Sequence, residues 1–150
     1  LCLTTEEWTI MAPMGKTRSG FAAILKDNYI YLFGGCNLVD MLSSTVRYSI
    51  ENNTWEDLPD MPEAPRDDHC AVSKSAGSKI YIVGGYNCSV EVFDTATLQW
   101  KTDELDLPDF MPEERRHAAA VLLNDTYLVV IGGTDDGKAT ITASSFIYDF

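Results

Sequence analysis

The sequence predicts an all-β fold, a β-propeller of about three four-stranded antiparallel sheets in an incomplete ring. Its main evidence is an apolar stretch that ends in a pair of glycines and occurs three times, at residues 28–35, 79–85 and 126–133. The first glycines stand at 34, 84 and 132, so the period is 50 and then 48 residues. A period of this length is typical of solenoids, propellers and arrays. Four short strands per unit favour the propeller, because such sheets pack face to face around an axis.

The first repeat supplies its four strands in order. Residues 20–25 are small and apolar, and a turn at residues 26–28 follows, because Asp and Asn tolerate the backbone angles of a hairpin. The first glycine-ended strand comes next, and its β-branched and aromatic residues indicate burial on both faces. Residues 45–50 alternate in period two and predict the third strand. Trp55 opens the fourth strand after a turn at residues 51–53.

The second and third repeats follow the same order of elements. In the second, we expect strands at residues 69–72, 79–84 and 90–94, turns at 75–78 and 95–97, and a last strand that Trp100 opens. In the third, we expect a strand within residues 115–121, a turn at 124–125, the third glycine-ended strand and a strand at 146–149. The predicted units are roughly 16–62, 63–112 and 113–150, with residues 1–15 as the last strand of a preceding or closing blade.

Aromatic residues recur at a fixed spacing within the repeats. Tyr48 precedes Trp55 by seven residues, and Phe93 precedes Trp100 by the same interval. The equivalent partner of Tyr148 would fall at position 155, beyond the last residue, and Trp8 has no aromatic partner seven residues before it. The chain therefore begins and ends within a repeat. We expect a fragment of a longer propeller, and the alternative hypothesis is a dimer of two copies that closes a six-bladed ring.

These elements together resemble the kelch repeat over essentially the whole chain. The shared features are a glycine pair after an apolar strand, an aromatic residue, a Trp seven residues later, Met-Pro, and an Arg before the next small-residue strand. They are carried by Gly34, Gly35, Gly84, Gly85, Gly132, Gly133, Tyr48, Phe93, Tyr148, Trp8, Trp55 and Trp100. The resemblance implies a β-propeller in which each blade is one four-stranded sheet. Two positions depart from the pattern: Phe93 replaces a Tyr, and Phe21 stands where His69 and His117 stand in the other repeats.

Composition limits the kinds of partner. Asp and Glu number 23 against 11 Lys and Arg, so the formal net charge is -12. Such an acidic surface repels phosphate backbones and anionic lipid headgroups, so we expect neither nucleic acid nor membrane as a partner. Solubility and attraction of basic partners are the two interpretations of this charge.

Location and redox state follow from what the sequence lacks. No apolar run approaches the length of a membrane span, and no signal peptide is visible. The four cysteines show no metal-binding or redox spacing, and we interpret them as free thiols. We therefore expect an intracellular protein, most simply a cytoplasmic one.

Loop lengths distinguish the two faces of the predicted array. The turns between the first and second and between the third and fourth strands are short, whereas the other connections are long and unequal. Variable loops on a rigid scaffold usually carry recognition. The candidate partner-binding residues on the long-loop face are Arg18, Asn37, Asp40, Arg66, Tyr86, Asn87, Arg115, Arg116, Thr134, Asp135 and Asp136.

Some of these residues also have a structural interpretation. The arginines that precede the first strands recur with the repeat, so bracing the loops against carbonyls or carboxylates is the alternative to binding a partner. Asp135 and Asp136 are compatible with the start of a calcium site, but the usual alternating acidic ligands do not follow, and a solvated loop tip is the simpler interpretation. His69 and His117 recur with the repeat, which favours a structural role over a metal site.

The sequence therefore predicts a protein–protein interaction module, with no catalytic, cofactor-binding or metal-binding residues. The alternative, which the resemblance implies, is a non-catalytic part of a galactose-oxidase-like or other kelch-fold enzyme. A purely structural role for the chain is a third hypothesis. Fold alone does not decide among them.

Overall fold

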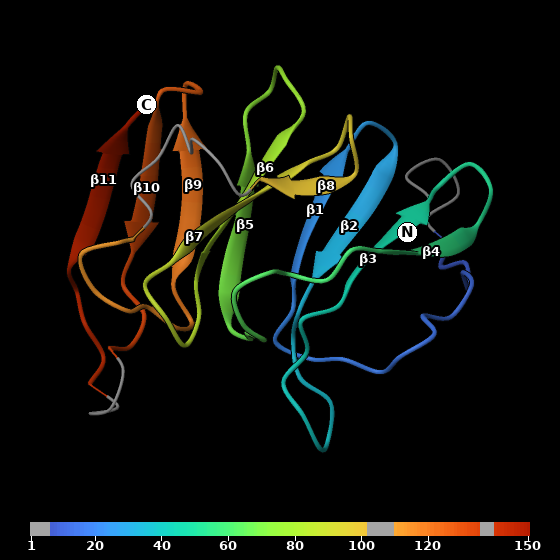
Figure 1. Ribbon diagram of the computed structural model, residues 1–150, viewed down its shortest axis with the longest axis horizontal. Coiled ribbons are helices and arrows are strands. Elements are labelled where there is room, and N and C mark those ends of the chain that lie inside the picture. Colours follow the sequence, from blue (N-terminus) through green and yellow to red (C-terminus); the bar gives the residue numbers. More distant parts are fainter. Residues whose placement is uncertain (1–6, 102–109, 136–139) are drawn as a thin grey trace.

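The structure is a computed structural model that describes residues 7–101, 110–135 and 140–150. Its strands form three antiparallel sheets that stand side by side (Figure 1), and no described residue is helical. Sheet 1 contains β1 (Ala22–Lys26), β2 (Tyr29–Phe33), β3 (Thr45–Ser49) and β4 (Thr54–Leu58). Sheet 2 contains β5 (His69–Ser73), β6 (Lys79–Gly84), β7 (Val90–Asp94) and β8 (Gln99–Lys101). Sheet 3 contains β9 (Ala119–Leu123), β10 (Tyr127–Ile131) and β11 (Ser145–Asp149), and the predicted all-β architecture is confirmed.

The hairpin turns follow the local sequence. Asp27 and Asn28 both have positive φ angles, of 49° and 64°, and so do Asn124 and Asp125, of 52° and 57°. A two-residue turn with two positive φ angles matches the twist of the strands that it joins, and Asn and Asp are among the residues that tolerate it. Each sheet is thus a meander in which neighbours along the chain pair in order.

The glycine pairs connect one sheet to the next. Gly34 has a φ of +55°, and a Cβ built on it would lie 2.4 Å from the backbone carbonyl oxygen of Arg66. Gly35 donates its backbone N–H to that oxygen at 2.9 Å, and Gly85 repeats the contact with the carbonyl oxygen of Arg115 at 2.7 Å. Glycine is therefore required because the backbone of the following unit passes too close for any side chain.

The hydrophobic core lies between the sheets. Tyr31 and Phe33 of sheet 1 pack against Ile80, Ile82 and Phe93 of sheet 2. The opposite face of sheet 2 packs against sheet 3 through a second cluster, whose buried members are Val72, Tyr81, Val83, Val90, Val92, Met111, Leu128 and Val130. Both faces of the middle sheet are buried, as the continuous apolar run in β6 predicts, so each sheet depends on its neighbours for stability.

A backbone ladder joins the innermost strands, β1, β5 and β9. Asp68 donates its N–H to the carbonyl oxygen of Gly20 at 2.8 Å, and His117 donates to that of Asp68 at 3.0 Å. All three residues have positive φ angles, between 52° and 61°, so His117 is equivalent to Asp68 and Gly20. The expected equivalence of His69 and His117 is wrong by one residue. His117 is equivalent to Asp68, and His69 is the next residue, which already pairs with Gly84 inside the β5–β6 ladder.

The segment before β1 contains no strand between residues 7 and 15. Trp8 is 85% exposed, and we find no pairing of this segment with β11 among the described residues. Its assignment to another blade, like the limits of the repeat units, stays a prediction. Within the part of the chain that the structure describes, there is no helix long and apolar enough to cross a membrane.

Candidate functional site

The long loops gather on one face, which we call the loop face. It comprises the connections between the second and third strands of each sheet and the connections between sheets, and it forms the lower side of Figure 1. The two kinds of loop are joined by backbone hydrogen bonds, from Met61 N to Ser43 O at 2.9 Å and from Met111 N to Cys88 O at 2.7 Å. On the opposite face, Thr95 N donates to Ser78 O at 2.8 Å, which joins two short turns. This is the arrangement that the loop lengths predict.

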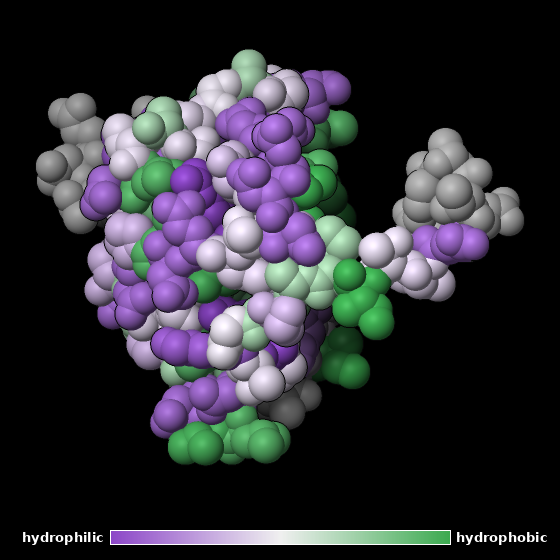
Figure 2. All heavy atoms as spheres, turned by 90° about the vertical axis from the view of Figure 1, so that its right-hand side faces the viewer, coloured by the Kyte–Doolittle hydropathy of each residue, from purple (hydrophilic) through white to green (hydrophobic). Residues whose placement is uncertain are grey.

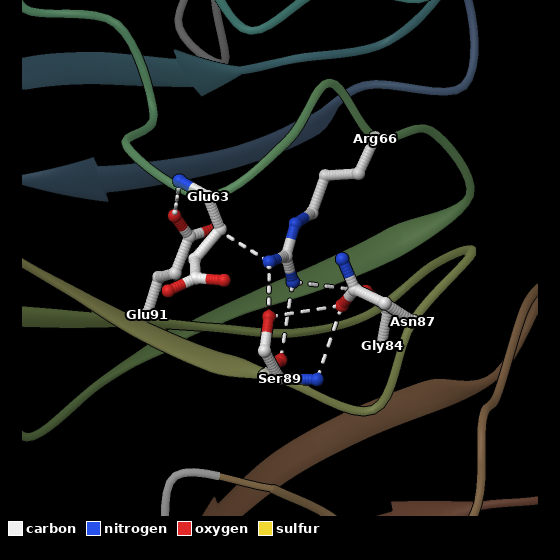
Figure 3. Close-up of polar contacts among 6 residues, drawn as sticks. All are labelled: Glu63, Arg66, Gly84, Asn87, Ser89 and Glu91. Atoms are coloured by element: carbon white, nitrogen blue, oxygen red, sulfur yellow. Dashed lines mark hydrogen bonds and ion pairs between the residues drawn. The ribbon is translucent and has the colours of Figure 1, made fainter.

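Arg66 is fully buried beneath the loop face, and Figure 3 shows its polar contacts. Its guanidinium donates to the carbonyl oxygens of Gly84 and Ser89 at 3.1 and 3.2 Å, and to the Ser89 hydroxyl at 2.7 Å. It also forms an ion pair with the buried Glu91 carboxylate at 2.5 Å. A second carboxylate oxygen of Glu91 accepts the backbone N–H of Glu63 at 3.1 Å. One side chain thus fixes the loop between β6 and β7 and the loop that precedes β5.

Burial controls the ionisation of this pair. Loss of hydration lowers the pKa of Arg66, although the nearby Glu91 charge opposes the change. Burial likewise raises the pKa of Glu91, although the Arg66 charge opposes that rise. Removing either group would leave the other as a buried charge without its partner, which is strongly destabilising.

The same brace occurs in the other two repeats. Arg18 donates to the carbonyl oxygen of Gly34 at 2.8 Å and to the Ser44 hydroxyl at 3.1 Å. Arg115 donates to the Ser144 hydroxyl at 2.5 Å and pairs with Glu113 at 2.7 Å. These contacts match the alternative in which the repeated arginines hold the loops. The side chains of Arg66 and Arg115 are buried, so they support the loop face from below.

The loop between β2 and β3 ends in an ordered apolar tip. The Asn37 side-chain oxygen accepts the backbone N–H groups of Val39 and Asp40 at 2.7 and 2.8 Å, which closes a tight turn. This turn leaves Leu38 and Val39 exposed, at 105% and 84% of their full surface. The loop is the lowest point of Figure 1, and Figure 2 shows hydrophobic residues at the same lower end. Leu38 and Val39 were not among the candidates predicted from the sequence, where the available signal was an apolar pair between Asn37 and Asp40 in a predicted loop.

The candidates from the second repeat form a small ordered surface. The Arg116 guanidinium lies 4.1 Å from the ring centroid of Tyr86, a cation–π contact between the loops of sheets 2 and 3. Tyr86 keeps part of its ring exposed. Asn87 accepts the backbone N–H and the hydroxyl of Ser89, so its amide shapes the loop that Arg66 braces.

The candidates from the third repeat lie at its outer loop. Thr134 exchanges backbone hydrogen bonds with Arg116 at 2.9 and 3.1 Å. Asp135 accepts the backbone N–H of Thr140 at 3.3 Å, and Asp136 lies outside the described residues. Phe110 and Ile141 are further exposed apolar residues on this face that the sequence analysis did not select.

The histidines do not combine into a reactive centre. His69 is 7% exposed, and its burial, with the Arg66 charge as a second cause, lowers its pKa to about 4. His117 lies on the surface, with its Nδ1 3.4 Å from an oxygen of Asp68. Among the described residues, no group of three or more His, Cys, Asp or Glu side chains is placed to hold a metal ion.

Comparison with known proteins finds a kelch-repeat domain over the whole chain. Residues 1–150 match the family model described as the KLHDC2/KLHL20/DRC7 Kelch-repeats domain. The chain is 30% identical to Kelch-like protein 26 of Danio rerio over 87% of its length and 32% identical to Kelch-like protein 38 of Rattus norvegicus over 96%. It is also 27% identical to Kelch-like protein terF of Aspergillus terreus over 96%. It spans only 21%, 24% and 34% of these three relatives, respectively.

Proposed function

The chain belongs to the kelch-repeat family, and from this premise we propose that it is a protein-binding module whose loop face carries the contact surface. The observation that carries the proposal is the apolar tip formed by Leu38 and Val39. Burial of these two neighbouring aliphatic side chains against another protein would remove their apolar surface from water, which is favourable. The tip is already ordered by Asn37, so binding requires little further ordering.

Other candidates on the loop face add polar and aromatic groups to the proposed contact surface. Asp40 adjoins the tip, Tyr86 and Arg116 form the stacked pair in the next loop, and Asp135 lies on the outer loop of sheet 3. Aromatic and arginine side chains are enriched at the centres of protein interfaces. Arg66 and Arg115 belong to the proposal as supports of the loops, because their buried guanidinium groups do not reach the surface.

The proposal includes no catalytic activity, cofactor or metal. Family membership leaves open the alternative of a non-catalytic part of a kelch-fold enzyme, since one fold serves many functions. The feature of the loop face that favours binding is the exposure of Leu38 and Val39 at its tip.

Net charge and thiol chemistry support proposals about the kind of partner and the location of the protein in the cell. We propose a protein partner, because the net charge of -12 disfavours nucleic acid and anionic membranes. We also propose an intracellular, cytoplasmic location. Cys36, Cys70 and Cys88 are free thiols in the structure, as is usual in a reducing compartment.

A quantitative affinity purification tests this function. The bait is the chain with the double substitution Leu38→Asp and Val39→Asp, compared with the unchanged chain in extracts of the source cells. The matched control is Ala76→Asp with Thr97→Asp, which adds the same charge to exposed turns on the opposite face. We expect the loop-tip variant to lose at least about 90% of each specific partner, since a buried contact of this kind is worth about 2 kcal/mol. Equal loss from both variants, or none from the first, would contradict the proposal.

A further inference from the structure

Two neighbouring aspartates, Asp67 and Asp68, lie on the loop face where β5 begins. β1 and β5 stand side by side (Figure 1), so the two aspartates adjoin the residue that leads into β1, Gly20. A Cβ built on Gly20 would lie 3.0 Å from Oδ1 of Asp68 and 3.4 Å from Cβ of Asp67. Both side chains therefore flank Gly20, which is itself exposed. We call these three residues the aspartate site, and the two sheets that form it each have four strands.

Asp67 is a buried carboxylate without a bond to hold it. The residue is 8% exposed, and its Oδ1 has no hydrogen-bond partner in the part of the chain that the structure describes. Removing a polar atom from water without giving it a partner is unfavourable. Such a group in a folded protein calls for an explanation, and a ligand that supplies the missing donor is one.

The repeat shows what the equivalent side chains do. Ser19, Asp67 and Arg116 hold equivalent positions, each one residue before its member of the inner backbone ladder. The Ser19 hydroxyl lies 3.4 Å from Sγ of Cys36, and the Arg116 guanidinium stacks on Tyr86. Both contacts reach the loop that follows a glycine pair. The carboxylate between sheets 1 and 2 is thus the member of this set whose partner remains to be supplied.

Asp68 adds a second carboxylate that a ligand can reach. Its side chain is 25% exposed, and its Oδ1 lies 3.4 Å from Nδ1 of His117. The His117 side chain is 59% exposed, so solvent surrounds much of this contact and a stronger donor can replace it. The aspartate site therefore offers carboxylate oxygens from two adjacent residues beside a glycine that leaves room for a ligand.

Carboxylates in this arrangement fit an organic cation better than a metal ion. A metal site needs more ligands, and within the described ranges no set of three His, Cys, Asp or Glu side chains is placed to provide them. A guanidinium group instead binds carboxylates through parallel N–H donors, and such charge-assisted bonds are short and strong. The net charge of -12 attracts cationic groups from a distance.

The aspartate site lies at the base of the loop that carries the apolar tip. Ser19 and Cys36 exchange backbone hydrogen bonds at 2.8 and 2.9 Å, which ties the start of this loop to the residue before Gly20. Leu38 and Val39 follow Cys36 directly after Asn37. A protein that covers the tip therefore passes close to the two aspartates.

We propose that the aspartate site receives an arginine side chain of the protein that binds the loop face. This inference rests on the proposed function and assigns the chemistry of the partner. The partner places apolar side chains against Leu38 and Val39, and a neighbouring arginine donates to the carboxylates of Asp67 and Asp68. Attraction of basic partners, one of the two interpretations of the acidic composition, then acts through these two residues.

Nuclear magnetic resonance of the isotope-labelled chain tests the aspartate site without the partner. The probe is N-acetyl-arginine methylamide, and the control probe is the same derivative of citrulline, which keeps the shape but lacks the charge. We expect the arginine probe alone to shift the amide signals of Gly20, Asp67 and Asp68. The dissociation constant should be on the order of 10 mM, because one charge-assisted contact is weak.

Matched variants locate the binding. Asp67→Asn combined with Asp68→Asn should abolish the shifts. Asp27→Asn, on an exposed turn of the opposite face, should preserve them, and Asn tolerates the positive φ angles of both Asp27 and Asp68. Equal shifts from the two probes, shifts that survive the double variant, or no shift at these residues would overturn the proposal.

Stability separates a binding role of Asp67 from a structural one. Asp67→Asn should leave the midpoint of urea unfolding unchanged or raise it, because Oδ1 makes no hydrogen bond within the described chain. A lower midpoint than that of Asp27→Asn would show that the carboxylate supports the fold, and it would overturn the binding role.

Affinity purification then connects the aspartate site to the partner. The double Asn variant should retain at most about one tenth of each protein that the unchanged chain captures and the loop-tip variant loses, since a bond to a charged group is worth at least about tenfold in affinity. Full retention by the double Asn variant, with loss by the loop-tip variant, would overturn the aspartate site and leave the proposed function standing.

Discussion

Replacing Arg66 by Met should destabilise the protein by about 3–5 kcal/mol, the usual cost of leaving one buried charge without its partner. The substitution keeps an unbranched side chain of similar length but removes the bonds to Gly84, Ser89 and Glu91. The Glu91 carboxylate remains buried, and its only remaining bond within the cluster is the one to Glu63 N. Since domains of this size are stable by about 5–15 kcal/mol, the loss is a large share of the total.

Two further variants separate the destabilisation due to the unpaired buried charge from that due to the lost hydrogen bonds. Arg18→Met removes the equivalent brace from sheet 1, where the guanidinium is only partly buried, and should cost about 1 kcal/mol. The double variant Arg66→Met with Glu91→Met removes both buried charges, and it should recover most of the stability that Arg66→Met loses.

Urea unfolding followed by Trp fluorescence measures all of these free energies at one pH. The slope of the free energy against urea should stay constant across the series, which shows that the variants unfold from the same state. A loss below about 1 kcal/mol for Arg66→Met would show that an unpaired Glu91 charge is not costly in this place. So would a double variant that is less stable than the single one.

Two other predictions concern pH and the glycine pairs. His69 stays neutral in the folded protein because burial lowers its pKa from 6.5 to about 4, whereas the unfolded chain takes up a proton below pH 6.5. The free energy of unfolding should therefore fall between pH 6.5 and pH 4 by up to about 3 kcal/mol. His69→Phe, which introduces the residue found at the equivalent Phe21, should remove that part of the pH dependence, and an unchanged profile would contradict the assignment. Gly34→Ala should cost about 2 kcal/mol or more in thermal or urea unfolding, because its Cβ meets the carbonyl oxygen of Arg66 at a positive φ angle. Gly15→Ala, with no atom within 4 Å, is the control and should change stability by less than about 0.5 kcal/mol.

Much of the fold was predictable because local patterns and repeat geometry agree. The apolar runs before Gly34 and Gly84 became the second strands of their sheets, and the Asp and Asn turns at residues 27–28 and 124–125 formed tight hairpins. The seven-residue spacing of Tyr48 and Trp55 corresponds to a directly opposed cross-strand pair. Local signals succeed here because each strand is short and its partner is the next element in the chain.

The repeat alignment failed where two similar residues lie one position apart. His117 shares the positive φ angle of Asp68, and only the strand register shows that His69 belongs to the following position. The two positions both carry a histidine, but the positive φ angle that Gly20, Asp68 and His117 share is the better guide to which positions are equivalent.

The candidate site was only partly predictable, because the burial of a side chain depends on the packing of elements that are distant in the sequence. The arginines that recur with the repeat were correctly given a structural alternative, but the sequence does not show that Arg66 and Arg115 are enclosed. The exposed pair Leu38 and Val39 was missed because apolar residues in a loop are usually buried by neighbours. Here the Asn37 turn holds them away from the core.

Hydrogen exchange of the chain, alone and bound to a captured partner, tests whether the loop face is the binding surface. We expect slower exchange in the loops at residues 35–44, 85–89 and 132–135, with the largest change next to Leu38 and Val39. We expect no change in the opposite turns at residues 75–78 and 95–97. Protection confined to those turns, with unchanged exchange at residues 35–44, would show that the loop face is not the binding surface.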